Sequence, residues 1–329
     1  MSSPPDPHID VAAAAARIRG MAVRTPLVPS LALSDRVGAE VSLKLETVQP
    51  TGSFKVRGAA SKILALSDVE RSQGVVTAST GNHGRAVAYV ARRLGIEATV
   101  CISPDVPPGK VRALRDLGAK VEIVGASQND ALDRAHAIVD STGAAFVHPF
   151  DDPAVIAGQG TIGLEIAQDL PAVATVLVPL SGGGLMGGIA TALAGAVPTA
   201  VPVAVSMERA PVMAMSLEAG RPVDVDEEET LADSLRGGIG LDNRHSFRLV
   251  SQLVKRVVLV GEESIWEGMR FLFEQHRVVA EGGAAVGVGA LLAGAVDPLD
   301  GPVVVLVSGA NAEPAHVAAL IAGEPAPTL

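Results

Sequence analysis

The stretch "TVQPTGSFKVRGAA", residues 47–60, places one lysine, Lys55, in a turn-rich segment that then runs into a helix. A lysine on the protein surface needs no such setting. A lysine amine that must stay deprotonated, be aimed by its backbone and reach a cofactor does need one, because only the deprotonated amine acts as a nucleophile or general base. Lys55 is therefore the first candidate catalytic residue.

The loop "SGGGLMGG", residues 181–188, lies between an apolar strand pattern and an apolar helix pattern. Consecutive glycines let backbone N–H groups approach an anion closely, and the N-terminus of the following helix adds its positive dipole end. The pattern predicts a phosphate-binding loop. A tight turn that binds nothing is the alternative.

The same loop contains Gly182, Gly184 and Gly187 at the G-x-G-x-x-G spacing. Glu208 ends the next predicted strand about twenty residues later, where a dinucleotide-binding unit has its ribose-binding acid. A nicotinamide-dependent dehydrogenase is therefore an alternative function, although a single match of this kind is weak evidence.

Two further segments place polar groups after predicted strands. "ASTGNHGRA", residues 78–86, offers hydroxyls, an amide and free backbone N–H groups at a helix start, which suit a small carboxylate or the polar edge of a cofactor ring. "VVLVSGAN" ends a buried strand at Ser308, and ligand-facing residues cluster at the carboxyl ends of such strands. The alternatives are a plain helix cap for the first segment and an ordinary turn for the second.

Strand and helix patterns alternate from residue 74 onward, as they do in parallel βαβ units. The first set has predicted strands at 74–79, 97–103, 119–125 and 144–149, and predicted helices at 82–95, 108–118 and 127–143, the last capped by Ser127. The second set has predicted strands at 174–180, 201–208 and 301–309, and predicted helices at 157–170, 185–196, 264–277 and 284–295.

The predicted fold class is α/β, with two open parallel-sheet domains and the active site in the cleft between them. We predict a large cofactor-binding domain made of residues 1–49 and 149–329. The remaining residues, 50–148, are predicted to form a small mobile α/β domain that starts between 50 and 75. The acidic run at residues 224–230 is predicted to be a solvated loop.

Composition narrows the possible partners and compartments. The net charge of −10 and the lack of a basic run argue against a nucleic-acid partner. Cys101 is the only cysteine, so no intrachain disulfide forms, as expected in a reducing compartment. Residues 171–207 carry no charge, but their glycines and prolines would break a membrane-spanning helix. Because the N-terminus is polar rather than signal-like, we expect a cytoplasmic protein without membrane contact.

Taken together, the motifs resemble the threonine/serine dehydratases, which are fold-type II enzymes, similar to tryptophan synthase β, that use pyridoxal 5'-phosphate. The shared motifs, in order, are "TGSFKVRGA", "STGNHG", "AVIAGQGTIGLE", "SGGGLMGG", "EGGAAVGVGAL" and "VSGAN". The segment "ADSLRGGIGLDNRHSF" looks more like the hydroxyectoine-utilisation dehydratase branch. The resemblance covers nearly the whole chain.

The resemblance implies a role for each matching residue. Lys55 matches the lysine that forms the Schiff base with pyridoxal phosphate, and Thr80 is the second candidate catalytic residue. The cofactor-binding residues implied are Phe54, Lys55, Asn82, Gly182, Gly183, Gly184, Leu185 and Ser308. The residues implied around the substrate are Ser79, Thr80, Gly81 and His83. Asn82 would face the ring hydroxyl, and Ser308 would face the pyridine nitrogen.

The implied activity is β-elimination of water from a β-hydroxy amino acid, giving a 2-oxo acid and ammonia. The substrate would resemble threonine or serine, or would be a hydroxy-diaminobutyrate derived from hydroxyectoine. A racemase and a β-replacing synthase of the same chemistry are alternatives, and so is a non-catalytic sensor. We expect a homodimer whose ligand is a small amino acid.

Three positions depart from the family pattern. Ser206 stands where relatives often have a glutamate that binds a divalent cation, with Glu208 two residues later, so no metal site is predicted. Thr80 stands where many relatives have serine, the second base of racemases. Gln128 lies near the position at which serine racemases use an arginine for the substrate.

Overall fold

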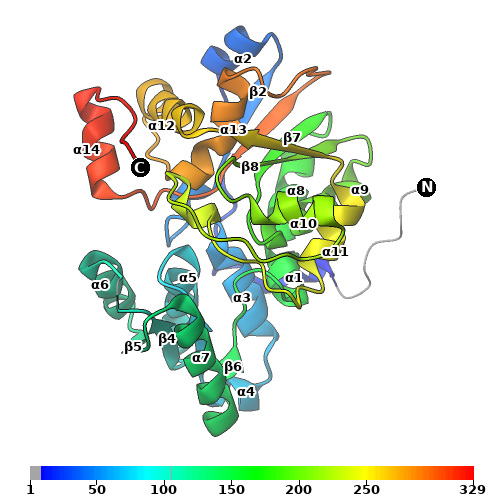
Figure 1. Ribbon diagram of the computed structural model, residues 1–329. Helices are drawn as coiled ribbons and strands as arrows, with labels where there is room; N and C mark the ends of the chain where they lie inside the picture. Colours follow the sequence, from blue (N-terminus) through cyan, green and yellow to red (C-terminus); the bar gives the residue numbers. More distant parts are fainter. Residues whose placement is uncertain (1–8, 105) are drawn as a thin grey trace.

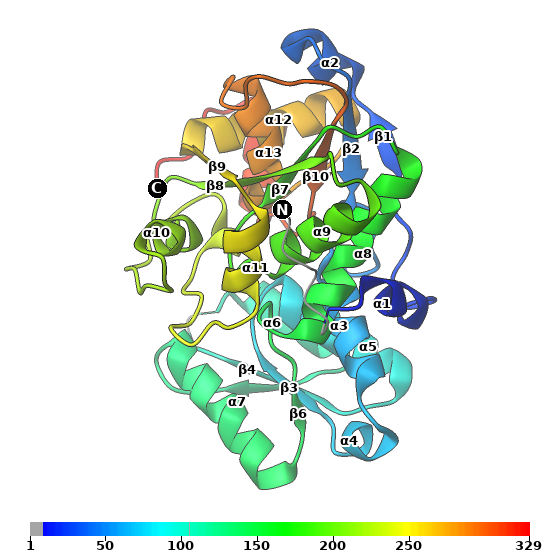
Figure 2. The same ribbon diagram turned by 90° about the vertical axis from the view of Figure 1, so that its right-hand side faces the viewer.

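The computed structural model describes residues 9–104 and 106–329, which form two sheets with helices on both faces of each (Figures 1 and 2). Six strands form the larger sheet in the order β1-β2-β10-β7-β8-β9, and four form the smaller sheet in the order β5-β4-β3-β6. Every neighbouring pair is parallel except β1 and β2. The predicted class of two open parallel sheets is therefore confirmed, with one antiparallel edge strand added.

The smaller sheet follows the predicted alternation closely. Its strands are β3 (Val75–Ala78), β4 (Ala98–Ile102), β5 (Lys120–Ile123) and β6 (Ala145–Phe146), and its connecting helices are α5 (Asn82–Leu94), α6 (Pro108–Asp116) and α7 (Gln128–Thr142). The Ser127 hydroxyl accepts the N–H of Asp130, which confirms the predicted cap of α7. Val75 packs toward α5, whereas Val76 packs toward α7, so both faces of β3 are apolar.

The larger sheet is buried on both faces. Its strands are β1 (Leu27–Pro29), β2 (Val41–Leu45), β7 (Thr175–Pro179), β8 (Val201–Met207), β9 (Arg256–Val260) and β10 (Val303–Val307). Val303, Val305 and Val307 pack on one side with α12 (Glu262–His276) and α13 (Gly282–Leu292), while Val304 and Leu306 pack on the other with α8 (Pro153–Asp169) and α9 (Gly184–Ala196). This two-sided burial explains the continuous apolar run of β10.

The other helices lie around this framework. They are α1 (Val11–Arg17), α2 (Leu31–Val37), α3 (Lys55–Ala65), α4 (Asp68–Ser72), α10 (Val212–Ala219), α11 (Ser246–Leu253) and α14 (Pro314–Ala322), with short 3₁₀ turns at Glu46–Val48 and Asp233–Leu235. Residues 224–230 form no helix or strand, as predicted. Within residues 9–104 and 106–329, no helix is long and apolar enough to cross a membrane.

Helix α3 lies between the two sheets and touches helices of both (Figure 2). Its backbone meets that of α8 without intervening side chains, because a Cβ on Gly158 would lie 2.5 Å from the carbonyl oxygen of Arg57 and 2.8 Å from the Cα of Gly58. The side-chain oxygen of Gln159 also accepts the N–H of Gly58 at 3.2 Å. The first turn of α3 is therefore anchored to the helix layer of the larger sheet.

A buried ion cluster strengthens this anchor. Arg57, only 1% exposed, donates Nε and Nη2 to both oxygens of Glu46 at 2.8 Å, and donates to both oxygens of Glu165 at 2.6 and 2.9 Å. Lys44 Nζ lies 2.7 Å from Glu165 and donates to the carbonyl of Thr25. Two cations and two anions thus join β2, α3 and α8 with every charge paired.

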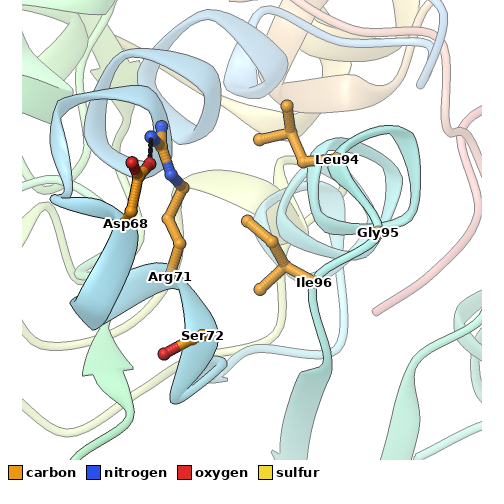
Figure 3. Close-up of a pocket in the computed structure, with 6 residues that line it drawn as sticks. All are labelled: Asp68, Arg71, Ser72, Leu94, Gly95 and Ile96. Atoms are coloured by element: carbon orange, nitrogen blue, oxygen red, sulfur yellow. Dashed lines mark hydrogen bonds and ion pairs between the residues drawn. The ribbon is translucent and has the colours of Figure 1, made fainter.

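We expect Arg57→Met to lower the free energy of unfolding by about 3–5 kcal/mol, because the buried carboxylate of Glu46 would lose its cation and that of Glu165 would keep only Lys44. The matched control is Arg71→Met. Arg71 pairs with Asp68, which is 95% exposed, beside an open surface pocket (Figure 3). That exposed pair should change the unfolding free energy by less than about 1 kcal/mol. Urea unfolding of both variants makes the comparison, and equal losses would contradict the proposed importance of the cluster.

Candidate active site

The carboxyl ends of β2, β10 and β7 meet at one edge of the larger sheet because these three strands are parallel neighbours. Ser308 follows β10, and the glycine loop follows β7. The segment before α3 is hydrogen-bonded to the end of β10, since Phe54 donates its N–H to the Ser308 carbonyl at 3.0 Å. The predicted cofactor residues Phe54, Lys55 and Ser308 therefore lie at the same edge as the glycine loop.

Lys55 is the first residue of α3, so the anchored first turn sets its direction. Its Nζ donates to the Pro149 carbonyl at 2.8 Å and lies 5.3 Å from the centre of the Phe54 ring. Burial lowers the pKa of the Lys55 amine to about 8, although the charge of Glu281 partly opposes this effect. A much larger fraction of this amine is deprotonated near neutral pH than of an ordinary lysine.

Larger residues would not fit the backbone of the glycine loop at Gly182, Gly183 and Gly184. Gly183 has a φ of +85°, and a Cβ on Gly182 would lie 2.4 Å from the Phe150 ring. A Cβ on Gly184 would lie 2.5 Å from the Phe150 carbonyl oxygen. No described side chain caps the start of α9, whose first-turn N–H groups have no acceptor within the helix. The loop, together with Leu185 in that first turn, fits a bound anion such as a phosphate.

A polar network behind the loop supports its shape. The Ser246 hydroxyl donates to the carbonyl of Gly182 at 2.6 Å. The carboxylate of Asp151 accepts the backbone N–H groups of Arg244, His245 and Ser246 at 2.7–2.9 Å. The segment that resembles the hydroxyectoine-utilisation branch therefore packs on the predicted phosphate loop, a placement that the sequence motif alone did not indicate.

The predicted substrate residues lie at the carboxyl end of β3, in the smaller sheet. Ser79 and Thr80 are half-buried, and Gly81, which precedes α5, has open space where a Cβ would stand. His83 is different, because its side chain is almost fully buried and its Nε2 lies 2.8 Å from the Val147 carbonyl. Burial and the nearby Lys55 charge lower the pKa of His83 to about 3, so the ring is neutral.

Asn82 connects the smaller sheet to the larger one. Its Nδ2 donates to Glu281 at 2.7 Å, and its Oδ1 accepts from Nδ2 of Asn311 at 2.5 Å. Arg85, one turn further along α5, donates to Oδ1 of Asn311 at 2.7 Å. The structure thus brings the predicted residue Asn82 together with three residues to which the sequence analysis gave no role.

Glu281 is the most notable of these additional residues. It is 4% exposed, and burial, together with the charge of Asp233, raises the pKa of its carboxyl group to about 7. One sequence signal could have identified it, since an acidic residue directly precedes the glycine-rich apolar helix in "EGGAAVGVGAL". Its partner Asn82 lies 199 residues earlier, which no local pattern reveals.

Two of the positions that depart from the family pattern, Ser206 and Gln128, make hydrogen bonds near the site. The Ser206 hydroxyl donates to the Leu180 carbonyl at 2.8 Å, just before the glycine loop, while Glu208 is exposed. Gln128 donates to the Ala78 carbonyl at 3.0 Å, beside Ser79. In the part of the chain that the structure describes, no group of three or more histidine, cysteine, aspartate or glutamate side chains is placed to hold a metal ion.

Comparison with known proteins gives a consistent result. The family model described as pyridoxal-phosphate dependent enzyme matches residues 18–309. A putative threonine dehydratase of Sinorhizobium fredii is 48% identical over 90% of this chain and 89% of its own. The L-threonine ammonia-lyase of Thermotoga maritima is 43% identical over 92% of this chain and 75% of its own.

Solved structures are similar as well. A threonine deaminase from T.th. has a TM-score of 0.85 and 37% identity, covering 94% of this chain and 99% of its own. Maize serine racemase has a TM-score of 0.90 and 32% identity, covering 95% and 96%. These two similar structures are named for different activities, deamination of threonine and racemisation of serine.

Proposed function

We propose that this chain, which belongs to the pyridoxal-phosphate dependent enzymes, is an ammonia-lyase that eliminates water from a β-hydroxy amino acid of the threonine and serine type. One observation carries the proposal. The Lys55 amine, with its pKa lowered to about 8, lies at the same sheet edge as a glycine loop that fits a phosphate. Relatives with threonine dehydratase or ammonia-lyase names support the same activity.

The residues present fit pyridoxal phosphate. The N–H groups of Gly182, Gly183, Gly184 and Leu185 would hold its phosphate, and Phe54 would lie against its ring. Asn82 and Ser308 would face the polar edges of the ring, where a neutral hydroxyl does not hold a proton on the pyridine nitrogen as a carboxylate would. A nicotinamide cofactor receives no comparable support, since the matching family is described as pyridoxal-phosphate dependent.

Bound pyridoxal phosphate supplies an electron sink that acidifies the Cα–H bond of an amino acid. Lys55 then acts as the general base at Cα, for which an amine with a pKa near neutrality is well matched. The backbone N–H groups at Gly81 and the hydroxyls of Ser79 and Thr80 bind and orient the substrate carboxylate. The Cα proton and the β-hydroxyl are lost together as one water molecule, and the enamine product then takes up water to give a 2-oxo acid and ammonia.

Racemisation is the second candidate function, favoured by the similarity to maize serine racemase. Thr80 has the hydroxyl that a second base on the opposite face of the substrate would need. A single experiment separates the two activities. Purified holoenzyme is incubated with L-threonine and L-serine, and ammonia, 2-oxo acid and D-amino acid are measured together.

We expect ammonia and 2-oxo acid in equal amounts, with D-amino acid as a minor product. D-amino acid without ammonia would replace the lyase with a racemase. Absence of all three products with every substrate would indicate a binding protein or a different activity. An acetylated hydroxy-diaminobutyrate belongs in the same screen, because it tests the proposed hydroxyectoine branch.

The lowered pKa of Lys55 has a measurable consequence for cofactor uptake. The deprotonated amine is the form that reacts with an aldehyde. We therefore expect the rate at which the apo-protein captures pyridoxal phosphate to rise with pH and to level off above about 8. Stopped-flow absorbance over a pH series measures this. A rate that keeps rising toward the ordinary lysine pKa of 10.5 would contradict the burial of this amine.

Domain division, assembly and location remain predictions. All four strands of the smaller sheet fall within residues 50–148, which supports the proposed small domain. Helix α3 is anchored to α8, so we propose that the moving unit begins after α3, within the predicted range of starts. We also propose a cytoplasmic homodimer. Light scattering of the purified holoenzyme tests the dimer.

A further inference from the structure

We propose that Glu281, Asn311 and Arg85 are positioning residues that fix the side-chain amide of Asn82, leaving one of its N–H groups as a hydrogen-bond donor toward the cofactor. The inference rests on the proposed function, because it concerns the same site. It adds residues to which the family resemblance gave no role. It follows from counting which groups can only donate hydrogen bonds and which can only accept them.

Arg85 and Thr51 determine the orientation of the Asn311 side-chain amide. Arg85 Nη1 lies 2.7 Å from one side-chain atom of Asn311, and a guanidinium can only donate, so that atom is the oxygen. The other side-chain atom lies 3.0 Å from the carbonyl oxygen of Thr51, which can only accept. Both contacts independently require the Asn311 nitrogen to face Thr51. One N–H of that nitrogen remains for another acceptor.

The orientation of Asn311 in turn determines that of the Asn82 side-chain amide. The remaining N–H of Asn311 requires an acceptor, and the atom 2.5 Å away is Oδ1 of Asn82. The Asn82 nitrogen then faces Glu281 at 2.7 Å, where a carboxylate oxygen accepts one of its two N–H groups. The second N–H of Asn82 has no acceptor among these partners. A flipped Asn82 would place two oxygens together at Glu281 and two nitrogens together at Asn311.

Hydrogen bonds to its backbone and to its carboxylate hold Glu281 in place. It lies immediately before α13, and its backbone N–H donates to the carbonyl of Gly309 at 3.1 Å. The Ser234 hydroxyl and the backbone N–H of Asn311 also donate to its carboxylate. A Cβ on Gly309 would lie 2.7 Å from the Glu281 carboxylate, so the glycine after Ser308 makes room for this side chain.

The charged groups that act on Glu281 come from two elements. Lys55 lies at the start of α3, and Asp233 lies in the 3₁₀ turn that begins at that residue. Asn82, Ser234 and Asn311 donate hydrogen bonds to its carboxylate. Protonation of Glu281 leaves one carboxyl oxygen able to accept from Asn82, so the orientation survives on either side of its pKa.

This chain of hydrogen bonds also crosses between the two sheets. Asn82 and Arg85 belong to α5 of the smaller sheet, whereas Glu281 and Asn311 follow elements of the larger one. Asn82 therefore presents its N–H to the cofactor only when the two parts lie together as they do here. The contact between Asn82 and the cofactor would therefore form when the smaller sheet meets the larger one.

The test measures binding of pyridoxal phosphate to the full-length apo-protein. Asn311→Asp replaces the donor to Asn82 with an acceptor, which favours the flipped amide. We expect about tenfold weaker binding of pyridoxal phosphate and a shifted absorbance maximum of the bound cofactor. Glu281→Gln keeps an acceptor oxygen for Asn82, so its affinity and spectrum should stay close to those of the unaltered protein. Glu281→Leu removes the acceptor and should weaken binding as Asn311→Asp does.

Two further variants serve as controls. Asn129→Asp introduces the same charge change at an exposed position of helix α7 and should change neither affinity nor spectrum. If Asn311→Asp fails to fold, Arg85→Met takes its place, because it removes the donor that orients Asn311. Arg85→Lys, which keeps one donor, should rescue the affinity lost in Arg85→Met. Thermal unfolding of each variant separates loss of folding from loss of binding.

Affinity and spectrum unchanged in both Asn311→Asp and Arg85→Met would overturn the inference. Equal losses in Glu281→Gln and Glu281→Leu would also overturn it, because a carboxylate charge rather than an acceptor oxygen would then be needed. Neither result depends on the reaction catalysed. Absence of ammonia release by the unaltered holoenzyme would instead count against the proposed function.

Discussion

Lys55→Ala is expected to abolish ammonia release, with a loss of about 10,000-fold or more, because one substitution removes the amine that we propose both to capture the cofactor aldehyde and to act as the base at Cα. The expected spectrum lacks the visible absorbance band that a lysine-bound aldehyde cofactor gives. Ammonia release and absorbance are measured on the same preparation. Activity retained in this variant would contradict the assignment of Lys55.

Lys62→Ala is the matched control for that experiment. Lys62 lies on the same helix, two turns after Lys55, and pairs with Asp152 at 2.6 Å rather than with the site. We expect its activity and spectrum to remain close to those of the unaltered protein. Thermal unfolding of both variants tests whether inactivity of Lys55→Ala reflects loss of folding.

Much of the fold could be predicted because it is encoded in local periodicity. The strands and helices of the smaller sheet alternate with clear caps and glycine stops, such as Ser127 before α7 and Gly95 after α5. The strand β10 was predicted from its continuous apolar run, which two-sided burial requires. In these segments local pattern and tertiary packing favour the same structure.

Two of the strands that the sequence did not predict are stabilised by distant partners. Strand β2 contains Lys44, which is fully buried only because Glu165 and the Thr25 carbonyl are brought to it by folding. Strand β1 has three residues and pairs antiparallel at the sheet edge. Neither shows a pattern strong enough to stand out in the sequence.

The residues in and around the candidate site also fall into two groups, those that local motifs predict and those that only the fold reveals. Lys55, the glycine loop and Ser308 lie in short motifs whose residue types suggest their chemistry. Glu281 does not, because its partner Asn82 lies 199 positions earlier. The role of Arg57 depends on Glu165, 108 positions later, as well as on the nearby Glu46. Buried polar groups are stabilised by exact partners, and partner identity is a property of the fold rather than of the local sequence.

A substitution in the glycine loop is expected to have the second large effect, a loss of cofactor binding. Gly183→Asp should abolish detectable binding of pyridoxal phosphate, a loss of about 100-fold or more, which is roughly 2.7 kcal/mol. The backbone of Gly183 has a φ of +85°, which any other residue adopts only with strain. A Cβ there would lie 2.7 Å from the Met213 side chain, and the carboxylate would compete for the N–H groups that should bind phosphate.

Two comparison variants separate charge from strain. Gly183→Asn adds a side chain of the same size without the charge, so any additional loss in Gly183→Asp measures repulsion of the phosphate. Gly220→Asp introduces the same residue at a φ of +69° with no atom within 4 Å of the new Cβ, and it should bind pyridoxal phosphate normally. Affinity is measured by equilibrium fluorescence titration of the apo-proteins. If Gly183→Asp loses no more affinity than Gly183→Asn, repulsion of the phosphate does not contribute to the loss. If both bind as tightly as Gly220→Asp, the first turn of α9 is not the anion site at all.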